Sequence, residues 1–75
     1  IIMILNKEYI NSQIRNLITI EGDNEGEIID DIMSSYVDFP GSYISDLNYP
    51  LEAAAYLLRI YVIDCLNNRP DLPTF

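Results

Sequence analysis

The side chains best suited to chemistry are carboxylates, and several gather in one stretch: Asp23, Glu25, Glu27, Asp30 and Asp31. A calcium loop needs oxygen ligands at regular spacing, a glycine at its turn and a closing glutamate, and the run from Asp23 to Gly26 does not fit that frame. Asp30 and Asp31 are adjacent, and neighbours on a helix point about 100° apart, so they cannot converge on one bond. We therefore expect a solvated acidic face and no metal site, with a basic partner surface as the alternative.

The chain lacks the residues that other kinds of catalytic chemistry need. The chain has no histidine, and Cys65 is its single cysteine. One cysteine cannot form a cysteine-rich zinc site, and a nucleophilic triad lacks its base. With no histidine or basic cluster nearby to activate it, Cys65 is expected to be a buried, unreactive thiol. The sequence therefore predicts a protein that is not an enzyme and that has no catalytic, metal-ligating or cofactor-binding residues.

The composition favours a small domain that works with a protein partner. The 75 residues allow one domain, 1–75, and hydrophobic residues make up 49% of it. Neither a disulfide nor a metal can reinforce so small a core, so we expect a partner to do so. The net charge of −8 opposes binding to nucleic acid or to an anionic membrane. The lone cysteine and the missing basic leader favour a cytoplasmic or nuclear location.

The longest apolar segment, Pro50 to Asn68, predicts a helix with clear ends. Pro50 suits a first helical turn, and Asn48 before it is a candidate cap. Apolar residues cover nearly the whole circumference, so we expect other elements to wrap this helix on several sides. Arg59 and Asp64 interrupt it, and its length falls short of a membrane span.

Upstream of this helix, the pattern predicts short strands alternating with helices. The expected elements are a strand at 1–5, a helix from Asn6 that breaks near Asn11 and Ser12, an acidic loop at 21–27, an amphipathic helix at 28–37, a turn at 39–42 and a strand at 43–47. An extended tail at 69–75 ends the chain. Short apolar runs indicate buried strands, and apolar pairs every four residues indicate a helix. The predicted fold class is α+β, with a central buried helix at 50–68.

Several of these segments are similar to one known family. The matching segments are Tyr9–Ser12, Ile14–Ile18, Tyr43–Leu47 and the stretch 57–75, which contains Tyr61, Asn67 and Leu72-Pro73-Thr74-Phe75. Together they resemble the elongin C family of the Skp1/BTB/POZ superfamily. Two departures are visible: the segment 19–41 is longer than the family's loop, and the family's last helix is absent. We therefore expect 1–75 to be a fragment of a small BTB/POZ-like domain that lacks this helix.

The resemblance implies a non-enzymatic adaptor of a cullin-type ubiquitin ligase. It implies a hetero-oligomer with three protein partners: a receptor helix of the BC-box type, a ubiquitin-like subunit of the elongin B type, and a cullin. By position, Leu58, Tyr61 and Phe75 are the implied partner-binding residues, although the family typically has an aromatic residue at Leu58. Tyr56, on the same helix, is expected to pack in the core.

Two further hypotheses stay open. One is a small acidic inhibitor or immunity-type protein that binds a basic protein surface, in which case neutralising Asp30 and Asp31 should abolish binding. The other is a BTB-like module that associates with itself and has no role in a ligase. A stable homodimer of the isolated domain would favour this second hypothesis.

Overall fold

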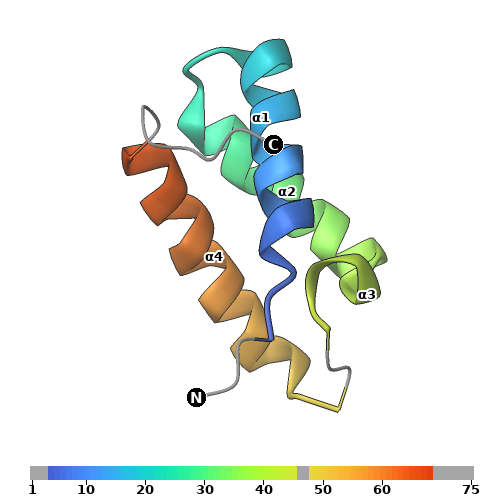
Figure 1. Cartoon of the computed structure of the whole chain (residues 1–75). Coiled ribbons are helices and arrows are strands. Elements are labelled where there is room, and N and C mark those ends of the chain that lie inside the picture. Colours follow the sequence, from blue (N-terminus) through green and yellow to red (C-terminus); the bar gives the residue numbers. More distant parts are fainter. Residues whose placement is uncertain (1–3, 46–47, 69–75) are drawn as a thin grey trace.

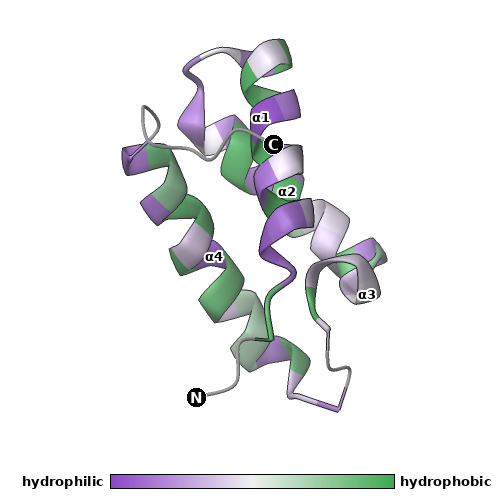
Figure 2. Ribbon diagram, viewed as in Figure 1, coloured by the Kyte–Doolittle hydropathy of each residue, from purple (hydrophilic) through white to green (hydrophobic). Residues whose placement is uncertain are grey.

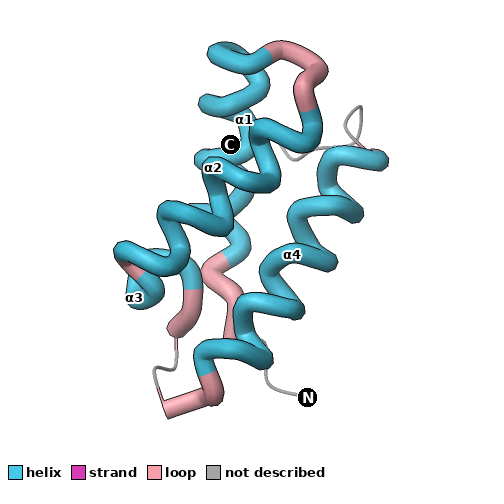
Figure 3. The backbone as a smooth tube through the Cα atoms, turned by 180° about the vertical axis from the view of Figure 1, so that it is seen from behind, coloured by secondary structure: helices cyan, strands magenta, loops and turns pink. Residues whose placement is uncertain are grey.

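The computed structural model describes residues 4–45 and 48–68 and consists of helices joined by short connections (Figure 1). The helices are α1 (Lys7–Glu21), α2 (Glu25–Asp38), α3 (Pro40–Tyr43) and α4 (Leu51–Asn67). α1 and α2 form an antiparallel hairpin, and α4 packs alongside both (Figures 1 and 3). Of the described residues, 79% are helical and none belongs to a strand.

The expected α+β fold, and with it the Skp1/BTB/POZ-like architecture, is therefore wrong for the described part of the chain. Among the described residues of the two expected strands, only Leu5 and Ile44 pair, in one isolated antiparallel bridge. Next to it, the Ser45 N–H donates a hydrogen bond to the carbonyl of Ile4 at 2.7 Å. On one side the bridge ends at once, because α1 begins two residues after Leu5 and α3 ends directly before Ile44. The expected strand residues 1–3 and 46–47 and the expected tail 69–75 lie outside the described residues.

α1 is continuous through Asn11 and Ser12, where a break was expected. Asparagine disrupts helices when its side chain competes for nearby backbone groups. Here the Asn11 side chain is buried and accepts hydrogen bonds from Tyr61 and Cys65 of α4 instead. A tertiary contact thus overrides the local preference of this residue.

A tight turn joins α1 to α2 and replaces most of the expected acidic loop. Gly22 has a φ of 67°, in the left-handed region that favours glycine. Asn24 then caps α2, because its Oδ1 accepts a hydrogen bond from the Glu27 N–H at 3.3 Å. The two helices take up the acidic residues at either end of the expected loop and place them side by side.

α2 has the amphipathic pattern that its sequence predicts. Its inward face buries Ile28, Ile32 and Tyr36 against the rest of the molecule. Asp30 faces solvent on the opposite side. The exception is Val37, which is 75% exposed near the end of the helix. The apolar stripe of α2 therefore extends past the region that the described core covers.

α3 is a single helical turn where a simple turn was expected. It starts at Pro40, whose missing N–H costs nothing at the first position of a helix. Its last residue, Tyr43, is completely buried. The Tyr43 ring packs edge-on against Tyr9 and Tyr36, with ring centres 5.1 and 6.1 Å away. This short element therefore supplies an aromatic centre for the core.

α4 confirms the long predicted helix but not its surroundings. It starts at Leu51, and its N-cap residue is Pro50 rather than Asn48. One face packs on α1 and α2 and buries Ala54, Leu58, Val62, Cys65 and Leu66. The opposite face is exposed, so the expected burial on several sides is wrong: the described chain has no further long helix to cover it. No described helix is both long and apolar enough to cross a membrane.

Two buried tyrosines provide a test of this packing. The Tyr36 hydroxyl donates a hydrogen bond to the carbonyl of Leu51 at 2.7 Å and so joins α2 to the start of α4. The buried Tyr43 hydroxyl has no hydrogen-bond partner among the described residues. We predict that Tyr36→Phe lowers the free energy of unfolding by about 1 kcal/mol, whereas Tyr43→Phe leaves it unchanged or raises it. Urea denaturation of both variants measures this, and a larger loss in Tyr43→Phe than in Tyr36→Phe would contradict the assignment.

Candidate functional site

The three residues expected to contact partners occupy different environments. Leu58 is completely buried and packs in the core. Tyr61 is half-buried, and its hydroxyl donates a hydrogen bond to Asn11 Oδ1 at 2.7 Å. Phe75 lies outside the described residues. The structure therefore does not place these residues together on one described surface, and their role in partner binding stays a prediction.

Tyr61 belongs to a small polar network between α1 and α4. Asn11 Oδ1 accepts from the Tyr61 hydroxyl and, at 3.5 Å, from the Cys65 thiol. The Lys7 ammonium lies 5.4 Å from the centre of the Tyr61 ring. Burial, and then hydrogen bonding to Cys65, raise the pKa of Tyr61 to about 12. Burial also raises the pKa of the Cys65 thiol, so this group is neutral and unreactive, and the network ties two helices together.

An acidic cluster lies where α1 meets α2. Carboxylate oxygens of Glu21, Glu27 and Asp31 all lie within 4.8 Å of one another. Hydrogen bonding to Asp31, together with partial burial and the charges of Asp31 and Glu27, raises the pKa of Glu21 above its ordinary value of 4.5. The sequence pattern placed Glu21 and Glu27 in a loop and so missed their convergence. Three carboxylates in one place could hold a cation, but acidic groups at an exposed helix end are common, and we assign them no ligand.

The outward face of α4 carries a continuous apolar surface. We call it the outer stripe and define it by Ala53, Tyr56, Leu57, Ile60 and Ile63. Spacings of three and four residues put these side chains on one face of the helix. The exposed fractions are 69% for Tyr56, 49% for Ile60, 40% for Leu57 and 38% for Ile63. Figure 2 shows the resulting pattern, in which α4 is coloured hydrophobic over most of its length.

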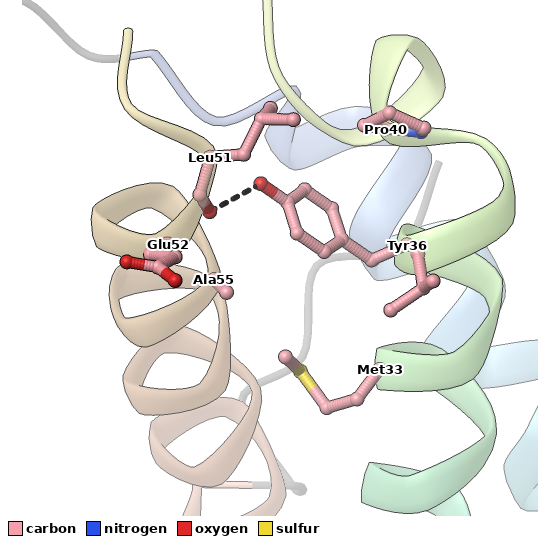
Figure 4. Close-up of a pocket in the computed structure, with 7 residues that line it drawn as sticks. Met33, Tyr36, Pro40, Leu51, Glu52 and Ala55 are labelled. Carbon is pink, nitrogen blue, oxygen red and sulfur yellow. Dashed lines mark hydrogen bonds between the residues drawn. The ribbon is translucent and has the colours of Figure 1, made fainter.

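A pocket opens beside the outer stripe, between α2 and the start of α4 (Figure 4). Its volume is about 320 Å³, and its lining is Met33, Tyr36, Val37, Pro40, Leu51, Glu52 and Ala55. In Figure 4 the Met33 side chain extends across towards α4, and the Tyr36–Leu51 hydrogen bond spans the gap between the two helices. All but one of these side chains are apolar or aromatic, which suits an apolar side chain of a partner.

Two charged residues border the outer stripe on the side of this pocket. Glu52, which also lines the pocket, and Arg59 are both exposed. They are seven positions apart, which is about two helical turns, so they lie on the same side of α4. This flank therefore carries one negative and one positive charge about 10 Å apart along the helix axis.

Comparison with protein-family models, curated proteins and solved structures found no match to this chain. The surface of the described structure is therefore the basis for inferring a function. That surface offers three features: the acidic cluster, the pocket and the outer stripe.

The outer stripe is the feature that sequence reasoning misjudged. The apolar character of Ala53, Leu57, Ile60 and Ile63 was visible in the sequence, but we expected other elements to cover them. Tyr56 was expected in the core and is instead 69% exposed. The available signal was the shortage of elements to cover this helix, because those described upstream of α4 amount to two long helices and one short helical turn.

The polar network gives the first prediction for this region. Asn11→Ala should lower the free energy of unfolding by about 1–2 kcal/mol, because two donors on α4 lose their shared acceptor. Tyr61→Phe removes one of these donors and leaves the other bond in place, so its loss should be smaller. Chemical denaturation of both variants compares them, and an equal or smaller loss in Asn11→Ala would show that the network is not coupled as described.

The acidic cluster gives the second prediction for this region. Because the pKa of Glu21 is raised in the folded chain, its stabilising contribution is complete below pH 4.5 and is lost as the pH rises through the folded-state value. Asp31→Asn should return the pKa of Glu21 towards 4.5, since it removes the neighbouring charge and the carboxyl partner. Carboxyl carbon chemical shifts followed from pH 3 to 7 report the titration. An unchanged Glu21 titration in Asp31→Asn would rule out this cause, and Asp30→Asn is the matched control.

Proposed function

We propose that this chain is a non-enzymatic protein-binding domain whose contact surface is the outer stripe with its adjacent pocket. The observation that carries the proposal is the exposure of Tyr56, Leu57, Ile60 and Ile63 on one face of α4. Scattered exposed apolar residues are normal, whereas contiguous apolar patches mark interaction sites.

Energetics support this choice of surface. Burial of apolar area contributes roughly 25 cal/mol per Å², and aromatic residues such as Tyr56 are enriched at the centres of interfaces. A helix presenting residues at spacings of three and four is a recurrent way of docking to a groove or to another helix. The pocket beside the stripe adds a concave site for one apolar anchor from the partner.

The proposal retains only part of the adaptor hypothesis. The role in a cullin-type ligase, with a BC-box receptor helix and an elongin B-type subunit, was implied by a fold that the described chain does not have. The general part of the adaptor hypothesis, that the domain acts by binding other proteins, does not depend on that fold. We further propose a reducing location, the cytoplasm or nucleus, because the single cysteine is unpaired and buried.

The test is affinity capture from cells with the outer stripe altered. We expect Ile60→Lys to reduce the recovery of specifically bound proteins about tenfold or more, since a charge in the centre of an apolar interface is desolvated without a partner. Ile20→Lys, at a residue of α1 that is 75% exposed, is the matched control and should bind as the unaltered chain does. Circular dichroism confirms that both variants remain helical.

Two outcomes would count against the stripe. If Ile60→Lys and Ile20→Lys recover the same proteins as the unaltered chain, the outer stripe is not the contact surface. If Asp30→Asn with Asp31→Asn abolishes recovery while Ile60→Lys does not, the acidic-inhibitor hypothesis replaces the proposal.

A further inference from the structure

The charges beside the outer stripe constrain what can cover it. Glu52 and Arg59 flank the stripe on one side, and Tyr56 lies between them in sequence. A partner that matches this flank presents a positive charge opposite Glu52 and a negative charge opposite Arg59. A second copy in the antiparallel orientation presents that arrangement on the same flank.

We propose that the outer stripe is covered by a second copy of this chain, with the two α4 helices antiparallel about a two-fold axis between Tyr56 and Leu57. This inference rests on the proposed function of the stripe and names its partner. Closed two-fold dimers are the commonest homo-oligomers, and they use the same patch on both copies.

The size of the stripe residues suits this register. An axis between Tyr56 and Leu57 places Ala53 of one helix opposite Ile60 of the other, twice in the dimer. A small residue facing a large one lets helix surfaces interdigitate at the usual separation of about 8–10 Å. Tyr56 of one copy then meets Leu57 of the other at the centre, where interfaces concentrate their binding energy.

The charges distinguish this orientation from the parallel one. In the antiparallel pair, Glu52 of each copy lies within side-chain reach of Arg59 of the other. In a parallel two-fold pair, opposite flanks face each other, so the flank with Glu52 and Arg59 would lie against the other flank of the second copy and these charges would not meet. Only the antiparallel arrangement brings Glu52 of each copy to Arg59 of the other, so the flank selects that arrangement.

The pocket is filled by the same arrangement. In an antiparallel pair around a two-fold axis, matching flanks face each other, so the pocket side of one copy meets the pocket side of the other. Ile63 is the member of the stripe at its C-terminal end, and this register places it opposite the start of α4, where Leu51 lines the pocket. An isoleucine side chain is an apolar anchor that suits an opening of about 320 Å³.

The experiment is sedimentation equilibrium of the purified chain at physiological ionic strength, over roughly a hundredfold range of concentration. We expect a reversible dimer. Glu52→Arg and Arg59→Glu should each weaken dimerisation about tenfold, because two contacts per dimer change from attraction to repulsion. The double variant exchanges the charges without changing the net charge, and it should regain most of the lost affinity. Asp30→Arg, which changes the net charge as Glu52→Arg does but lies on α2, is the control.

Each result supports or overturns one part of the proposal. A dimer that Ile60→Lys dissociates and that the double variant restores supports the antiparallel pair. A dimer that Ile60→Lys dissociates but that neither charge variant affects overturns the orientation. A monomer at every concentration overturns the self-association. If capture from cells still depends on Ile60 in that case, the stripe binds a different protein and the proposed function stands.

Discussion

The constraint behind this structure is that two long helices can cover only one side of a third. α4 is apolar around most of its circumference, and α1 and α2 together enclose the face that contains Leu58 and Val62. The remaining long apolar side chains of α4 have no described element to pack against. The outer stripe is therefore exposed because the described elements cover only one side of an apolar helix, and the pocket beside it forms where α2 and α4 separate at the start of α4.

Two groups of polar contacts fix where α4 lies, which apolar packing alone does not specify. Near its start, the carbonyl of Leu51 accepts from Tyr36 of α2. Towards its end, Tyr61 and Cys65 both donate to Asn11 of α1. Because these bonds involve different helices and opposite ends of α4, they set both its tilt and its rotation. That rotation turns Leu58 inward and Ile60 outward, so it also determines which face is available for binding.

Much of the helical content was predictable, because it follows from local patterns. The spacing of Ile28, Ile32 and Tyr36 predicted α2, and the long apolar run predicted α4. The predictions were wrong where tertiary contacts or the positions of neighbouring elements determine the local structure. Asn11 favours a break locally but is held within α1 by its bonds to α4. The apolar runs at 1–5 and 43–47 suit strands, but among their described residues only Leu5 and Ile44 pair, and α1 and α3 prevent further pairing on one side of this bridge. The candidate surface could not be predicted because hydrophobicity alone does not distinguish a buried face from an exposed one.

The antiparallel register accounts for several features of α4 that core packing leaves without a role. The core needs the buried face, and it imposes nothing on Tyr56, Ile60 or Ile63. A helix whose second face served only solubility would carry charges at these positions. Glu52 and Arg59 instead border the apolar stripe, two turns apart on one side, and Asp64 comes only at its C-terminal end. That placement matches the arrangement in antiparallel helix pairs, where apolar positions form the seam and flanking charges select the partner and its direction. The two faces of α4 thus have separate tasks: one completes the fold of a single chain, and the other joins two chains.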